Sequence, residues 1–383
     1  PPKGGFPRFH ELHGDDNLAV WLRNAGYYTG MVGKYLNGYA NQPRIPLGWT
    51  EWYATNFNDQ DVYNYKLNEN GTIVQYGADA ADFKQDVLTR RAADFVNRRA
   101  PKAQPFFLWL NYTAPHEGGW GGAQTDYCPG ITAKPAPRHA HAFDSEPLPR
   151  PPNFNEADVS DKPAEIRNRS LLGPSGFADL QRMYRCQLGS LLSVDEGVDD
   201  ILRALVASSE LSNTLIIYTS DNGFFNGEHR LSMLKRHIYE ESIRVPLVMR
   251  GPGIPRGVTI PDLSINADLA PTIVDAADAV PGLVMDGRSL IPVAQQPGIE
   301  QGRELLIENE VYYQQPSFNA IRTQRYMYAE HATGEKELYD LQKDPFELQS
   351  RHNAGAYASV RSALANRLRQ LQDCAGAGCR AHP

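Results

Sequence analysis

Long apolar segments and an excess of basic residues are both missing from this sequence. No apolar run approaches the roughly 20 residues that a membrane-spanning helix needs. The formal net charge is −7, which argues against nucleic acid as the main partner. The first five residues contain neither an initiator Met nor a signal peptide, so we interpret the chain as starting inside a longer precursor. The remaining composition, 41% hydrophobic and 22% charged, is that of an ordinary globular protein.

Cysteine is also scarce, with only four residues. Cys374 and Cys379 bracket a short Ala/Gly stretch that a disulfide could close, and Cys128 and Cys186 could form a second pair. Sequence alone does not assign the connectivity. Together with three Asn-x-Ser/Thr triplets, these cysteines favour an exported protein that is secreted, periplasmic or lysosome-like.

Short apolar runs alternate with segments of helical periodicity over the first 250 residues. The expected helices are 18–25, 88–96 and 188–205, and the expected strands are 27–33, 106–110, 215–219 and 245–249. Such alternation predicts an α/β fold with a mostly parallel sheet sandwiched by helices.

Polar residues directly follow several of these strands. Lys34 follows the first, His116 lies in the loop after the second, and Asp221 and Asn222 follow the third. Because ligands bind beyond the carboxyl ends of parallel strands, we expect these side chains to gather at one sheet edge.

The pattern changes in two places. Residues 128–163 show no periodicity, and a loop of that length is usually functional or disordered. After about residue 292 come four short expected strands and a helix, at 305–308, 318–323, 326–330, 337–341 and 358–371. We therefore predict a catalytic α/β domain at 1–295 and a smaller α+β subdomain with an antiparallel sheet at 296–383.

The polar residues have chemical interpretations and plainer alternatives. Asp221 and Asn222 offer the oxygen ligands that Ca²⁺ or Mg²⁺ prefers, although Asp-Asn-Gly is also a common turn. Lys34 could be a solvated strand end, His116 could only shape its loop, and Lys235 could belong to an exposed basic turn.

Motifs along most of the chain resemble the sulfatase family. The most specific is the run from 219 to 253, and further matches lie at 26–37, 114–116, 268–272, 286–290, 337–341 and 344–345. Residues 34–37, 46–49 and 191–195 are most similar to N-acetylglucosamine-6-sulfatases and their bacterial arylsulfatase relatives. The resemblance implies an alkaline-phosphatase-like fold and the hydrolysis of sulfate esters, with a sulfated carbohydrate such as 6-O-sulfated N-acetylglucosamine, or an aryl sulfate ester, as substrate.

The resemblance also implies roles for individual residues. Lys235 would contact the sulfate and the leaving oxygen, His116 would be the general acid, and Lys34 would orient the oxygen of the nucleophile. Asp221 and Asn222 would hold Ca²⁺, in preference to Mg²⁺, as a Lewis acid.

Two further residues complete the expected substrate pocket. Many sulfatases have a His two residues after the first lysine, where this chain has a leucine, so the neighbouring Asn37 is a candidate for that role. His229 is a second candidate for lining the pocket.

The Cys/Ser-x-Pro-x-Arg motif that yields the formylglycine nucleophile of sulfatases is absent from these 383 residues. Asp15 and Asp16 resemble the family's pair of metal-binding aspartates, but they precede a helix, and we assign them to helix capping. We therefore expect the nucleophile in an N-terminal portion of the same protein, whose loss would expose apolar surface. The alternatives are a phosphonate or phosphate ester hydrolase of the same superfamily, and a sulfated-glycan-binding protein without a nucleophile.

Overall fold

The computed structural model describes residues 4–39, 44–56, 61–118, 127–130, 132–299, 302–311 and 315–380. Internal contacts divide the chain into two compact units. The first comprises residues 1–148, 181–214 and 276–283, and the second comprises 149–180, 215–275 and 284–383. Each unit is built from several separate segments, whereas the sequence suggested a single boundary at residue 295. The functional domains expected at 1–295 and 296–383 stay a prediction.

A five-stranded mixed sheet forms the centre of the first unit. Its strand order is β4(Thr72–Gln75), β3(Lys66–Glu69), β2(Glu51–Asn56), β1(Tyr28–Gly33) and β5(Phe106–Asn111). Strand β1 runs parallel to both β2 and β5, while β3 runs antiparallel to its two neighbours, β2 and β4. The prediction found β1 and β5 but missed β2 to β4, although the Asn70-Gly71 turn between β3 and β4 is a typical hairpin signal.

Helices α1(Gly5–His13), α2(Leu18–Asn24) and α3(Lys84–Arg99) belong to the first unit, and α5(Pro174–Ala207) contributes to both units. Leu88 and Ala92 of α3 pack with Val32 of β1 in one hydrophobic cluster. The assignment of Asp15 and Asp16 to capping needs correction. Asn17 is the residue that caps α2, accepting hydrogen bonds from two backbone N–H groups, whereas Asp16 accepts one from the indole of Trp21 at 2.5 Å.

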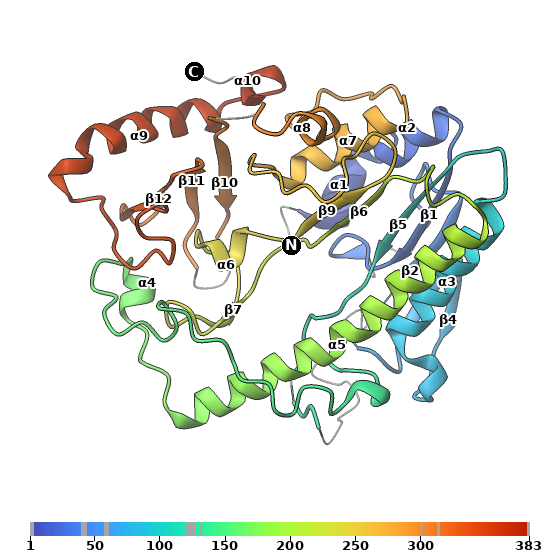
Figure 1. The fold of residues 1–383 in the computed structure, drawn as a ribbon, viewed down its shortest axis with the longest axis horizontal. Helices are drawn as coiled ribbons and strands as arrows, with labels where there is room; N and C mark the ends of the chain where they lie inside the picture. The colour runs from blue at the N-terminus through green and yellow to red at the C-terminus, as the bar shows by residue number, and fades with distance from the viewer. Residues whose placement is uncertain are drawn as a thin grey trace. The chain divides into compact units, whose positions relative to one another are not determined.

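The C-terminal antiparallel sheet expected from sequence is confirmed in the second unit. Its order is β10(Leu305–Asn309), β11(Phe318–Arg322), β12(Tyr326–His331) and β13(Lys336–Asp340). Leu364, Leu368 and Leu371 of helix α9(Ala358–Gln372) pack with buried residues of this sheet in one hydrophobic cluster. Figure 1 shows the helix beside the strands. The helical periodicity of residues 358–371 therefore reflects one buried face.

Strands β6(Ile216–Thr219) and β9(Leu247–Arg250) form a separate two-stranded antiparallel sheet in the second unit. Both strands lie where the sequence predicted them, and within the described residues they pair with each other and not with β1 or β5. Two of their large side chains are exposed, Tyr218 at 41% and Val248 at 61%. The adjoining hairpin consists of β7(Phe225–Asn226) and β8(Ser232–Leu234). The remaining elements are short: η2(Ala80–Asp82), η3(Pro137–His139), α4(Ala164–Arg167), α6(Glu240–Ile243), η4(Asn266–Asp268), α7(Leu269–Ala276), α8(Ile291–Gln295), η5(Gly355–Tyr357) and α10(Ala377–Arg380).

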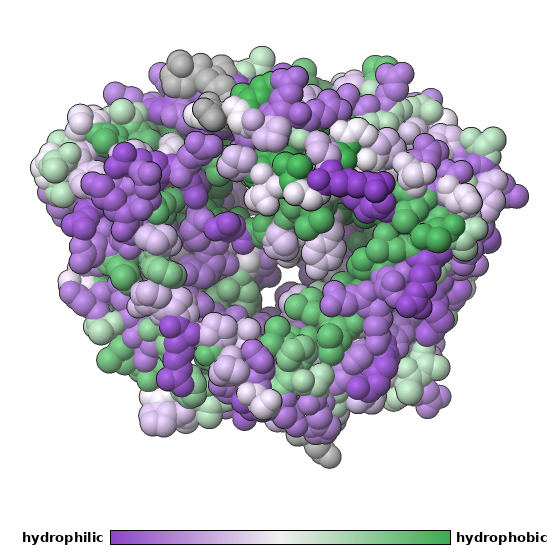
Figure 2. All heavy atoms as spheres, in the orientation of Figure 1, coloured by the Kyte–Doolittle hydropathy of each residue, from purple (hydrophilic) through white to green (hydrophobic). Residues whose placement is uncertain are grey.

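Both disulfides that the sequence allowed are present, Cys128–Cys186 in the first unit and Cys374–Cys379 in the second. None of the helices in the described ranges combines the length and the apolar character needed to span a bilayer. On the face drawn in Figure 2, hydrophobic residues are interspersed among hydrophilic ones.

Candidate active-site residues

Lys34 and His116 follow neighbouring parallel strands of the first unit. The Lys34 backbone N–H donates to the carbonyl of Asn111 at 3.0 Å, and the Asn111 side-chain amide donates back to the Lys34 carbonyl at 2.9 Å. The ends of β1 and β5 are thereby joined by two hydrogen bonds. Gly33 is required there, since it has φ +106° and a Cβ would lie 1.9 Å from the Asn111 carbonyl oxygen. Within this unit, the sequence correctly predicted that Lys34 and His116 follow strands ending at the same sheet edge.

The loop after β5 sets the position of His116. Its backbone includes a cis peptide between Ala114 and Pro115, and the His116 N–H donates to the Thr113 carbonyl at 2.8 Å. The His116 ring Nδ1 lies 3.0 Å from the Glu117 carbonyl oxygen and 3.6 Å from its carboxylate. Because Nδ1 is engaged by the local chain, a proton passed to a substrate would leave from Nε2.

Asn37 lies on an exposed turn of the first unit. Its carbonyl accepts a hydrogen bond from the Phe6 N–H at 2.8 Å. This backbone contact ties the turn to α1, and the substrate contact of the Asn37 side chain stays a prediction.

The second unit brings Asn222 and Lys235 together. The Lys235 ammonium donates to the Asn222 side-chain oxygen at 3.2 Å, although 13 residues separate them in sequence. Asp221 precedes Asn222 on the loop after β6 and is exposed. The carboxylate and amide oxygens of this pair fit a hard cation such as Ca²⁺ in kind, but Ca²⁺ takes six to eight oxygen ligands. Asp221 and Asn222 would therefore supply only part of such a site.

Ser242 holds both loops of this pair, and sequence reasoning missed it. Its hydroxyl accepts hydrogen bonds from the backbone N–H groups of Arg236 at 2.9 Å and His237 at 3.3 Å. Its carbonyl accepts from the Gly223 N–H at 2.9 Å. A side chain at Gly223 is excluded, because a Cβ would lie 1.9 Å from the Glu241 carbonyl oxygen. Nothing local in the sequence reveals a serine that bonds to residues 6 and 19 positions away.

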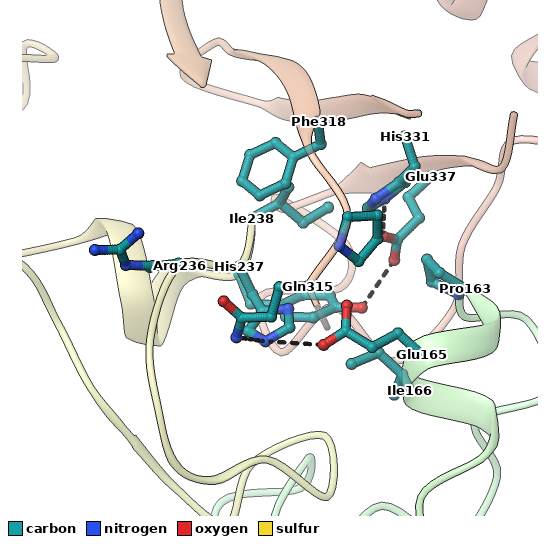
Figure 3. Close-up of a pocket in the computed structure, with 12 residues that line it drawn as sticks. Pro163, Glu165, Ile166, Arg236, His237, Ile238, Gln315, Phe318, His331 and Glu337 are labelled. Carbon is teal, nitrogen blue, oxygen red and sulfur yellow. Dashed lines mark hydrogen bonds and ion pairs between the residues drawn. The ribbon is translucent and has the colours of Figure 1, made fainter. Parts of the chain in front are cut away.

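A small polar pocket lies beside the Lys235 backbone in the second unit. Figure 3 shows His237, Gln315 and Glu165 pointing toward one another, and the Gln315 amide donates to the Lys235 carbonyl at 3.1 Å. Burial, with a smaller contribution from the nearby Arg169 guanidinium, lowers the pKa of His237 to about 3. The His237 imidazole is therefore neutral at physiological pH and is not a cationic sulfate ligand.

His229 is fully buried, at 0% exposed. Its Nδ1 lies 2.7 Å from a carboxylate oxygen of Glu156, and its Nε2 lies 3.1 Å from the Asn153 side-chain amide. This placement does not support the predicted substrate contact, because the described neighbours of His229 are protein side chains.

The predicted residues therefore fall into two groups, each within its own unit. Lys34, His116 and Asn37 belong to the first, and Asp221, Asn222 and Lys235 to the second. Their action in one catalytic site stays a prediction.

Known proteins are similar to this chain in sequence and in fold. The profile of the Sulfatase family matches residues 7–279, and that of the N-sulphoglucosamine sulphohydrolase C-terminal region matches 227–374. The chain is similar to a putative extracellular sulfatase Sulf-1 homolog of Caenorhabditis elegans, with 36% identity over 74% of this chain and 38% of that protein. It is also similar to the N-acetylglucosamine-6-sulfatase of Bos taurus, with 35% identity over 72% of this chain and 48% of that protein.

A solved structure supports the fold. BT4656 in complex with its substrate D-glucosamine-2-N,6-O-disulfate superimposes with a TM-score of 0.78 and 26% identity, covering 96% of this chain and 83% of that one. The class is thus an α/β fold of the alkaline-phosphatase kind with a C-terminal antiparallel sheet, as the sequence predicted. The chain belongs to the sulfatase family. It spans about two fifths to one half of the length of the two curated relatives described.

Proposed function

We propose that this chain forms part of an enzyme that hydrolyses sulfate esters on a carbohydrate, with 6-O-sulfated N-acetylglucosamine as the leading substrate. The observation that carries the proposal is the 3.2 Å contact between Lys235 and Asn222 in a chain of the sulfatase family. A sulfate monoester is an anion whose leaving oxygen gains charge during hydrolysis. An ammonium group held beside a metal-ligand oxygen is suited to stabilise that charge.

The proposed roles follow those residues. Lys235 binds the sulfate and its leaving oxygen, His116 protonates the leaving oxygen from Nε2, and Lys34 orients the attacking oxygen. Asn37 would contact substrate from its exposed turn. Asp221 and Asn222 would be ligands of Ca²⁺, which supplies Lewis-acid polarisation of the sulfate when bound. The attacking group would be a formylglycine from a Cys/Ser-x-Pro-x-Arg segment outside these 383 residues.

We also propose that the protein is exported, whether secreted, periplasmic or lysosome-like. Two disulfides support this proposal, because such bonds persist in oxidising compartments. A relative described as an extracellular sulfatase adds further support.

The test is sulfate release from 6-O-sulfated N-acetylglucosamine by the protein that carries this chain together with its nucleophile segment. We expect Lys235→Ala to lower kcat/KM by about 10²–10³-fold, the usual cost of one preorganised electrostatic contact. Lys102→Ala is the matched control, because it removes the same charge from an exposed position. Unchanged turnover in Lys235→Ala would overturn the proposed role.

Parallel assays separate the alternatives. Faster turnover of aryl phosphate or phosphonate esters than of sulfate esters would favour the other hydrolase class of the superfamily. Binding of the sulfated sugar without any sulfate release, in a protein lacking a Cys/Ser-x-Pro-x-Arg segment, would favour a glycan-binding protein.

A further inference from the structure

The second unit contains a cluster of metal-ligating side chains that includes none of the proposed catalytic residues. The cluster consists of His229 in the turn between β7 and β8, Glu241 on α6, and Glu347 in the turn after β13. One ligand atom from each lies within 4.8 Å of the other two. Two neighbouring segments and a third from more than 100 residues further along the chain thus direct ligand atoms to one interior point.

Several oxygens in this cluster are buried without a hydrogen-bond partner. They are Oε1 of Glu347, Oε2 of Glu241 and Oδ1 of the neighbouring Asn153. Glu347 is 1% exposed and Asn153 is 0% exposed, so water does not solvate them. Buried oxygens of this kind are costly unless a proton donor or a cation satisfies them.

Neighbouring side chains hold the His229 ring in a fixed orientation. Glu156 faces Nδ1 at 2.7 Å, and the buried Lys162 ammonium lies 3.4 Å from the other oxygen of Glu156. When the Nδ1 proton is donated to Glu156, the lone pair of the ring lies on Nε2. The ring also stacks on Tyr239, with centroids 4.1 Å apart. A carboxylate that holds Nδ1–H while Nε2 faces the metal is the usual arrangement around metal-bound histidine.

The described hydrogen-bond donors to the Glu241 and Glu347 carboxylates are neutral groups. The Glu241 carboxylate accepts a hydrogen bond from the Asn153 amide at 2.7 Å, and the Glu347 carboxylate accepts one from the Glu240 backbone N–H at 2.9 Å. Neither donor carries a charge, and a bound cation would add charge-assisted contacts to these carboxylate oxygens.

Asn153 offers a fourth ligand. Its Nδ2 lies 3.1 Å from His229 Nε2 and donates to Glu241 Oε1 at 2.7 Å, while its Oδ1 has no partner. The two amide orientations have the same shape. Turning the amide over would bring the unsatisfied oxygen to the position beside His229 and Glu241.

We propose that His229, Glu241 and Glu347, with Asn153 as the fourth ligand, bind one divalent transition-metal cation in a buried site separate from Asp221 and Asn222. Zn²⁺ matches this mixture of one imidazole nitrogen with carboxylate oxygens, whereas Ca²⁺ prefers oxygen alone. Ligands at zinc distances lie about 3.4 Å apart in a tetrahedron. The observed spacing needs to contract by little more than an ångström, which rotation of the glutamate side chains provides. The metal would fasten the β7–β8 turn and α6 to the turn after β13.

Metal content of the purified chain tests the proposal. After dialysis against a weak chelator and addition of Zn²⁺, we expect one zinc per chain by mass spectrometry, and a rise in Tm on titrating the stripped protein with Zn²⁺. Glu347→Gln should weaken zinc binding by at least about 100-fold. Glu156→Gln, which alters only the orienting group, should weaken it by about 10–100-fold.

Two control variants test whether zinc binds at the proposed cluster and not at other carboxylates. Glu330→Gln removes a carboxylate of β12 outside the cluster and should keep the full zinc content. Asp221→Ala should also keep it, so the result does not depend on whether the chain takes part in sulfate hydrolysis. Wild-type protein that is folded but neither retains zinc nor gains stability from it would overturn the proposal, and so would zinc lost in Asp221→Ala but kept in Glu347→Gln.

Discussion

Replacing Gly33 by alanine should destabilise the first unit and displace Lys34. Gly33 has φ +106°, a conformation in which an L side chain costs about 1–2 kcal/mol. In addition, the new Cβ would lie 1.9 Å from the backbone carbonyl oxygen of Asn111, so the ends of β1 and β5 must separate. Overpacking of this kind costs about 1–3 kcal/mol. We therefore expect the free energy of unfolding to fall by about 2–5 kcal/mol.

Gly26→Ala is the matched control. Gly26 also has positive φ, +91°, but a Cβ there would have no atom within 4 Å. Its cost should be the conformational part alone, about 1–2 kcal/mol. The assay is urea unfolding followed by circular dichroism, with sulfate release measured on the native variants. Because a displacement near 1 Å can cost about 10²-fold in rate, Gly33→Ala should also lose activity that Gly26→Ala retains. Equal destabilisation by the two substitutions would refute the steric argument.

Three other substitutions test parts of the structure. Ser242→Ala removes the hydroxyl that accepts two backbone N–H groups, and should lower kcat/KM for sulfate esters about tenfold or more with a smaller effect on Tm; unchanged kinetics would contradict its positioning role. Glu51 has a pKa lowered to about 2, because hydrogen bonds from Arg98 and Tyr28 outweigh the opposing effect of burial. Since the folded pKa lies below the ordinary 4.5, this stabilisation is present above about pH 5 and lost as the pH falls toward 2. In urea unfolding at pH 7, the free energy of unfolding of the wild type should exceed that of Glu51→Gln by about 2–3 kcal/mol. A difference in unfolding free energy that persists at pH 2 would contradict this account. Cys186→Ser opens a disulfide with a sequence separation of 58, and the chain-entropy relation predicts a loss of about 4 kcal/mol, to be checked by the shift in urea midpoint under non-reducing conditions.

The sequence predicted those helices and strands whose apolar residues form a regular pattern along the chain. Helix α9 was found because its apolar positions recur at helical spacing, and β5 because it is a continuous apolar run. Strands β2 to β4 were missed because their composition is mixed and their signal is a two-residue turn. The sequence did not predict which strand pairs with β6, since alternation of helices and strands does not encode pairing.

For the candidate active-site residues, too, the sequence determined some features and the tertiary structure determined others. The sequence by itself determined the sulfatase resemblance and placed Lys34, His116 and Asp221 directly after strands or in the loops that follow them, because these features lie within short stretches of chain. Only the tertiary structure decided that Lys235 donates to Asn222, that Ser242 holds both of their loops, and that His229 is buried against Glu156. The physical reason is that burial and hydrogen-bond partners depend on contacts across long separations, as between His229 and Glu156, which are 73 residues apart. A histidine near a catalytic motif has the same sequence signature whether it faces substrate or the interior, and only its neighbours in space distinguish the two.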